Sequence, residues 1–289
     1  MKKVKKVKGF YTIYKSCFTF FTFFISLINV SSMAFATPAE DAIAQLWGAH
    51  RNAPNDHESM VARCNDAMRR RSGDAPLLGN FQPVAQTLLG WHLLRQGKTN
   101  EAVRTFEGVL TPNPSPDHVA RTADLMARRW LTRIDHAKVV GALRVYYAAN
   151  VAYPPSLDYF NSVPEHERPP MRDRFGEAWY FKETTFSRIK TAAGQRYDLY
   201  SSSIGKELTD FSKIGKRYPL PAMTMVRKGG GMPITLEFTN PSTPDAAPVA
   251  LAVGGVSPTG LRFVALDSAG RFALLSDSDF WFIAMPKGK

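Results

Sequence analysis

The sequence predicts an α+β protein, because three different patterns follow one another along the chain. Apolar residues recur at helical spacing over 39–135, one further helical stripe precedes alternating aromatic segments over 136–210, and short apolar runs separated by turn residues fill 221–289. These patterns predict four parts: a leader (1–36), a helical region (37–135), a mixed helix-and-sheet domain (136–220), and a small antiparallel β domain or sheet extension (221–289).

The leader has the features of an export signal. Lysines without any acidic residue precede an apolar run from Phe18 to Val30, and small residues at Ala34 and Ala36 fit the −3 and −1 positions of a signal peptidase site. Cleavage is expected before Thr37. The apolar run is too short to span a bilayer comfortably. We therefore expect a soluble protein in the periplasm or outside the cell, with no membrane span after cleavage.

A second interpretation of the leader stays open. The segment "KVKGFYTIYK" resembles a prepilin signal, in which a basic leader ends in glycine and cleavage precedes phenylalanine, as at Gly9-Phe10. The glutamate expected at the fifth mature position is Tyr14 here, and Lys15 follows it.

Net charge indicates which classes of partner to expect, and cysteine content indicates whether a disulfide can form. The formal charge of +12 includes six leader lysines, and without them 31 basic residues face 25 acidic ones. No basic stripe with interleaved aromatics is present, so nucleic acid is not expected as a partner. The run Arg69-Arg70-Arg71 is placed at a helix end, where cations are favourable. After cleavage only Cys64 remains, which excludes an intramolecular disulfide and predicts a small buried side chain.

Residues 83–116 resemble a single tetratricopeptide repeat. Leu89-Gly90 supplies the large and the small residue for close contact between the two helices, and Gly97 ends the first helix. Asn100 is expected to cap the second helix, Ala102 and Phe106 to pack from it, and Pro114 to end it. A lone repeat leaves apolar faces uncovered, so helices at 39–71 and 117–135 are expected to complete the stack. A generic bundle of helical hairpins is the alternative.

Residues 136–210 resemble the soluble domain of the major pseudopilin of type II secretion systems. A helical stripe from Val139 to Tyr146 runs into "YPPSLDYF", where Pro154 and Pro155 end any helix. Two ordered motifs follow: "DRFGEAWYF" (173–181), with a tight turn at Asp173 and Gly176, and "GQRYDLYSSSIG" (194–205). The family's tetrapeptide Tyr-Asp-Leu-Tyr is present from residue 197. The resemblance implies one helix packed on an antiparallel sheet.

The chain departs from this family in two ways. The family binds calcium with an aspartate-rich loop, so the resemblance leaves calcium possible. The matching loop here offers only Glu207 and Asp210 as acidic residues, which is poor in ligands, so no cofactor or metal site is predicted. The apolar assembly helix of a filament subunit would be separated from the head by about 100 residues of helical repeat.

Beyond Gly229-Gly230-Gly231, which lacks the residues of a phosphate-binding loop, five runs read as strands. They are "ITLEF", "APVALAVGGV", "LRFVALD", "RFALLSD" and "FWFIAM". "DSAG" after Leu266 predicts a hairpin, and "SDSD" (276–279) predicts a turn rather than a cation site.

No catalytic constellation is found. Ser201 to Ser203 end a strand, and Glu165 and Glu167 lie in a proline-rich loop. Trp91 is expected in the core and His92 on the surface. The remaining histidines are dispersed without the i, i+4 pairing of a helical metal site: His50, His57, His118, His136 and His166. The expected catalytic, cofactor-binding and metal-binding residues are therefore none.

The function that these observations favour is non-enzymatic protein–protein recognition in the bacterial cell envelope, as an accessory of a type II secretion or pilus-like system. One alternative is a minor pseudopilin filament subunit with an atypical leader. Another is an envelope carbohydrate-binding protein or enzyme, with Trp179, Tyr180 and Trp281 as sugar platforms.

Overall fold

The structure is a computed structural model, and it describes residues 36–184, 196–211, 223–228, 234–240 and 247–287. The chain divides into two units, Met1–Ala36 and Thr37–Lys289. The predicted leader, including the Gly9-Phe10 junction, makes up the first unit and lies outside the described residues except for Ala36. Gly229-Gly230-Gly231 also lies outside them.

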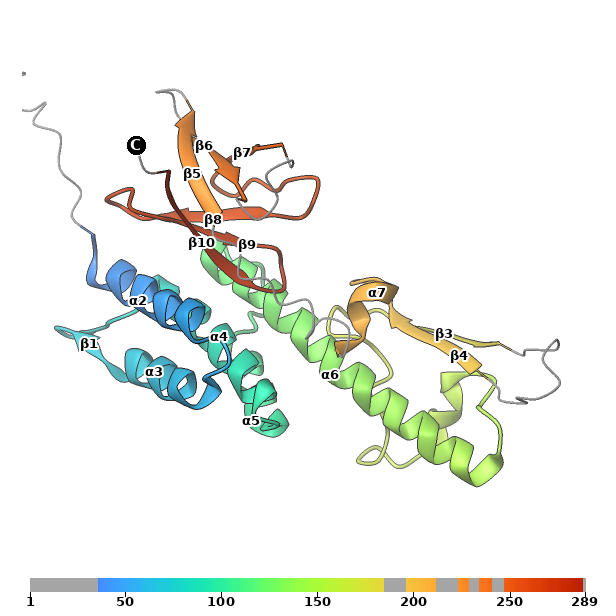
Figure 1. The fold of residues 1–289 in the computed structure, drawn as a ribbon. Helices are drawn as coiled ribbons and strands as arrows, with labels where there is room; N and C mark the ends of the chain where they lie inside the picture. The colour runs from blue at the N-terminus through green and yellow to red at the C-terminus, as the bar shows by residue number, and fades with distance from the viewer. Residues whose placement is uncertain (1–35, 185–195, 212–222, 229–233, 241–246, 288–289) are drawn as a thin grey trace, which may run out of the picture. The chain divides into compact units, whose positions relative to one another are not determined.

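Four helices open the second unit (Figure 1): α2 (Pro38–Asn52), α3 (His57–Arg69), α4 (Gln82–Arg95) and α5 (Thr99–Glu107). Helix α2 begins with a capping box, in which the Thr37 hydroxyl accepts from the Glu40 amide and Glu40 accepts from the Thr37 amide. Helix α3 ends at Arg69, so the arginine run does lie at a helix end. A 3₁₀ turn, η1 (Gly79–Phe81), and two short strands, β1 (Arg71–Ser72) and β2 (Ala75–Pro76), connect α3 to α4.

The α4–α5 hairpin is held by a close helix contact at Gly90. A Cβ atom built on Gly90 would lie 2.7 Å from two ring carbons of Phe106, which is fully buried. Gly97, at φ +76°, ends the turn after α4 as predicted. The prediction that Asn100 caps α5 is wrong: the helix begins directly after this glycine turn, with Lys98 at the cap position.

Helix α6 (His118–Asn150) is a single helix of 33 residues. It runs without interruption through residues 135 and 136, where the sequence suggests a domain boundary. The Asp117 side chain caps its first turn by accepting from the Val119 amide. The helix ends before the two prolines, at Val151, whose backbone is left-handed (φ 56°) and donates to the Tyr147 carbonyl.

The C-terminal strands form one six-stranded sheet in the order β7-β6-β5-β10-β9-β8. All neighbours pair antiparallel except β5 and β10, which are parallel. The strands are β5 (Met223–Lys228), β6 (Thr235–Thr239), β7 (Val249–Ala252), β8 (Arg262–Leu266), β9 (Ala273–Ser276) and β10 (Trp281–Pro286). Each of the five predicted runs contains a strand, and "DSAG" forms the β8–β9 hairpin turn; β5 was not predicted.

The first four helices, the N-terminal part of α6 and this sheet share one hydrophobic core. Buried residues of that core come from Ile43 at its start to Ala284 at its end. Glu40 on α2 also accepts hydrogen bonds from the Ser268 amide and hydroxyl in the β8–β9 turn. The helical region and the C-terminal β region, which the sequence suggests are separate domains, therefore bury their apolar faces against each other.

A second, smaller core belongs to the segment that resembles a pseudopilin. It joins Val139 and Leu143 of α6 to η2 (Leu157–Ser162) and to Trp179. Trp179 starts β3 (Trp179–Thr184), which pairs antiparallel with β4 (Arg196–Ser201), and a short helix α7 (Lys206–Thr209) follows. We call this segment, from Val139 to Thr209, the helix–hairpin module. Its hairpin is a separate sheet, so the C-terminal strands do not extend it.

Within the part of the chain that the structure describes, none of the helices has the length and apolar character needed to cross a bilayer.

Candidate interaction surface and the groups that position it

Asp173 anchors the entry to the hairpin of the module. One carboxylate oxygen accepts from the Phe175 and Glu177 amides at 2.9 and 3.0 Å. The other accepts from the hydroxyls of Ser201 and Ser203, both at 2.6 Å. Burial alone would raise the pKa of Asp173, but these bonds hold it below its usual range. Ser201 is the last residue of β4, as predicted, and its hydroxyl serves the Asp173 turn.

Arg174 links this turn to the helical region. Its Nε donates to Asp135 on α6 at 2.5 Å, its terminal nitrogen lies 3.1 Å from Glu107 on α5, and its amide donates to Thr132. These three contacts attach the Asp173 turn of the module to α5 and α6.

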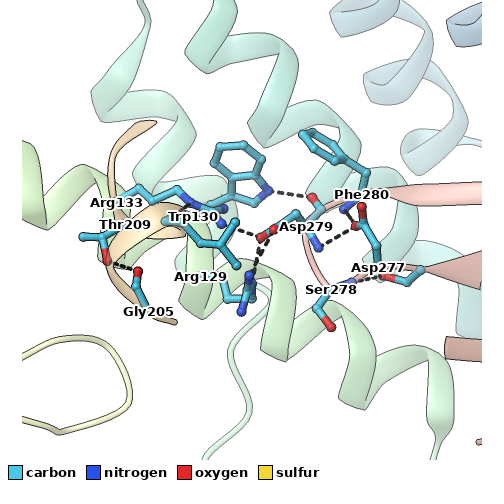
Figure 2. A network of polar contacts seen from close by, with 11 residues as sticks. Arg129, Trp130, Arg133, Gly205, Thr209, Asp277, Ser278, Asp279 and Phe280 are labelled. Atoms are coloured by element: carbon cyan, nitrogen blue, oxygen red, sulfur yellow. Dashed lines mark hydrogen bonds and ion pairs between the residues drawn. The ribbon is translucent and has the colours of Figure 1, made fainter. Parts of the chain in front are cut away.

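A buried ionic network joins α6 to the β9–β10 turn and α7 (Figure 2). Arg129 contacts both Asp279 carboxylate oxygens at 2.7 and 3.0 Å, and Arg133 contacts one of them at 2.6 Å. Arg133 is 0% exposed and also donates to the Leu208 carbonyl. Its guanidinium lies 4.5 Å from the centre of the Trp130 ring. Burial would raise the pKa of Asp279, but the two arginines hold it below its usual range.

The "SDSD" segment is a turn, as predicted. Asp277 accepts from the amides of Asp279 and Phe280, and Ser276 accepts from the Ser278 amide. Burial, together with the charge of Asp279, raises the pKa of Asp277 to about 6. Since Asp279 is already neutralised by arginines, the two carboxylates do not form a cation site.

Three histidines that are dispersed in the sequence meet in space. Nε2 of His92 lies 3.0 Å from Nδ1 of His50, and Nδ1 of His92 lies 3.0 Å from Nδ1 of His57. The prediction of a surface His92 is wrong, because the ring is completely buried beside Trp91, which is in the core as expected.

The histidine cluster is built for neutral rings. Burial, and then the neighbouring histidines, lowers the pKa of His50 to about 4 and that of His92 to about 3. His50 and His57 approach opposite nitrogens of His92, so the nitrogens do not converge on one point. Among the described residues, no group of three histidine, cysteine or acidic side chains is arranged to hold a metal ion.

The other side chains singled out in the sequence are mostly structural. Cys64 is buried, as predicted, and burial raises the pKa of its thiol to about 12. Trp179 and Trp281 are buried and donate to the Pro170 carbonyl and the Thr87 hydroxyl. Of the three proposed sugar platforms, only Tyr180 is exposed, so these three side chains do not form a shared aromatic platform.

An apolar groove of about 360 Å³ lies on the helix–hairpin module, between the end of α6 and the η2 turn. Val145 on α6 is 73% exposed and Tyr159 on η2 is 48% exposed. The Tyr159 ring packs edge-on against Tyr146, with ring centres 4.5 Å apart. We call this groove, with Val145 and Tyr159 on its rim, the α6–η2 groove. Val151, at the cap position directly after α6, is 78% exposed.

Comparisons with protein-family models, curated proteins and solved structures found no match to this chain. The resemblances to a tetratricopeptide repeat and to a pseudopilin domain therefore stay predictions from the sequence.

Proposed function

We propose that this protein is exported to the bacterial cell envelope and acts there in non-enzymatic protein–protein recognition, as an accessory of a type II secretion or pilus-like system. The α6–η2 groove is the observation that carries this proposal. A groove with protruding apolar residues on its rim is the kind of surface that anchors a protein partner.

Backbone strain beside the groove supports a role for this end of α6. Val151 is β-branched, has φ of 56° and is largely exposed, so neither conformational preference nor core packing favours valine there. Asparagine or glycine would end the helix at lower cost. An apolar side chain at this strained surface position fits a role in contacting a partner.

The occupant that we propose for the groove is the soluble head of a pseudopilin, because the module itself resembles such a head and these heads assemble with one another. Arg174 would then hold the bound head next to the helical region, which offers a second surface.

A photocrosslinking experiment tests this proposal. A benzophenone amino acid replaces Val145 in the mature chain, and the protein is mixed with each purified pseudopilin head of the host. The matched control carries the same group at Glu58, an exposed position on α3. We expect a crosslink to one head from position 145 and none from position 58. Crosslinks to no head, or equal crosslinks from both positions, would refute the proposal.

The export step has its own test, which also separates the filament-subunit alternative. The intact mass of the protein purified from its host should correspond to a chain that starts at Thr37. A chain that starts at Phe10, especially an N-methylated one, would mean prepilin processing and a filament subunit instead.

A further inference from the structure

A second concave site lies away from the α6–η2 groove, at the other end of α6. It is a pocket of about 490 Å³, bounded by the segment after α5, the first turns of α6, the Asp173 turn and the start of β8. This volume is within the range that small-molecule sites occupy. Three arginines line the pocket: Arg121, Arg128 and Arg262.

The only carboxylate among the lining residues is already neutralised. Asp124 accepts from Arg128 at 2.9 Å and from the Thr111 amide at 2.9 Å. Arg128 also donates to the carbonyls of Thr111 and Arg174, which fixes its guanidinium in the wall. The described residues that line the pocket offer no second carboxylate to balance the charges of Arg121 and Arg262, so the lining is electropositive.

Arg121 and Arg262 each have N–H groups that are available for a further hydrogen bond. Arg121 donates from Nε to the Ser115 carbonyl and from one terminal nitrogen to the Pro116 carbonyl, and a guanidinium carries five N–H groups. Nε of Arg262 is buried and has no hydrogen-bond partner among the residues that the structure describes. A buried charged donor without an acceptor is costly, and nearly all buried donors in folded proteins have one. An acceptor that enters the pocket would relieve this cost.

The rest of the wall is apolar. Pro112, Pro114, Leu125 and Phe175 line the pocket beside the arginines. A ligand that suits both parts carries a negative group for the guanidinium donors and an apolar body for the prolines and the aromatic ring. Guanidinium groups bind carboxylate and phosphate in the same forked geometry, so both groups satisfy this description.

We propose that this pocket binds a small organic anion, with one carboxylate or phosphate group held by Arg121 and Arg262 and an apolar portion against Phe175 and the prolines. The site is separate from the α6–η2 groove and does not depend on the function proposed for that groove.

Calorimetric titration of the mature chain at pH 7 tests the proposal with three probes of similar size: benzoate, phenyl phosphate and benzyl alcohol. We expect one or both anions to bind at millimolar concentration and the neutral alcohol to bind at least about tenfold more weakly, since charged hydrogen bonds account for such a factor. Binding of benzoate alone would identify a carboxylate site, and binding of phenyl phosphate alone a phosphate site.

Two variants locate the binding. Arg262→Gln and Arg121→Gln should each weaken the bound anion at least about tenfold. Arg69→Gln, at an exposed position at the end of α3, should leave its affinity unchanged. Circular dichroism checks that each variant is folded; Arg121 is exposed, so its variant stays informative if Arg262→Gln does not fold. Failure of both anions to bind, equal binding of the alcohol, or anion binding that neither variant weakens would overturn the proposal.

Discussion

Gly90→Ala is a sharp test of the α4–α5 contact. In the interior of a helix, replacing glycine by alanine stabilises a protein by about 0.5–1 kcal/mol, because alanine loses less backbone entropy on folding. At Gly90 the new methyl group would lie 2.7 Å from two carbons of the buried Phe106 ring. Such overpacking of a core costs about 1–3 kcal/mol. The clash therefore outweighs or cancels the gain.

The matched control is Gly48→Ala in α2, where a Cβ atom would meet nothing within 4 Å. This variant should be more stable than the parent by about 0.5–1 kcal/mol. The free energies of unfolding of the two variants, measured by urea denaturation, should then differ by about 1–3 kcal/mol, the cost of the clash alone. For a protein of this size that corresponds to about 2–4 °C in Tm for each kcal/mol.

A double variant identifies the source of the difference. Replacing Phe106 by leucine removes the ring atoms that the Gly90→Ala methyl group would meet, so the combined variant should lose less stability than the sum of the single losses. If Gly90→Ala stabilises the protein as much as Gly48→Ala does, the close contact between α4 and α5 is not present and the reasoning fails.

Three further predictions concern charge, pH and strain. Asp279→Asn leaves two arginines without their carboxylate and should cost about 3–5 kcal/mol in urea denaturation, whereas Asp66→Asn, in an exposed ion pair, should cost less than about 1 kcal/mol; similar losses for both would contradict the buried network. The pKa values of His50 and His92 in the folded protein are about 4 and 3, below the ordinary 6.5. At pH values between these and 6.5, the unfolded chain binds more protons than the folded protein does. The free energy of unfolding should therefore fall as the pH is lowered from 7 to 4. Each histidine contributes at most about 1.4 kcal/mol per pH unit, and a variant with apolar residues at both positions should show a shallower dependence; an unchanged slope would show that the rings are not buried neutral. Val151→Gly should raise stability by about 1 kcal/mol in thermal unfolding by relieving the left-handed valine, and a lower Tm would contradict strain at this helix end.

Local patterns were enough to predict much of the fold. The pair Gly90 and Phe106, the glycine at position 97 and the five C-terminal runs each depend on residues that are close in the sequence. Strand β5 was missed because its segment follows prolines and lacks clear alternation. It is a strand because it pairs antiparallel with β6 on one side and in parallel with β10, far along the chain, on the other.

The interior polar groups could not be predicted in the same way. His50, His57 and His92 come from three helices, and no local spacing shows that their rings meet. Arg133 resembles any helical surface arginine, and it is buried only because Asp279 and a carbonyl of α7 lie opposite it. Likewise, an apolar helix face shows that cover is needed but does not show that the C-terminal sheet supplies it.

The layout of the larger core also sets an order of events as the chain is made. Glu40 binds Ser268 across 228 residues, and the last strand supplies core residues, so the N-terminal helices have no lasting cover until the end of the chain is available. The helix–hairpin module depends on contacts within one contiguous stretch and can close earlier. The two cores can therefore form at different times, and the larger core is complete only once the C-terminal strands are available.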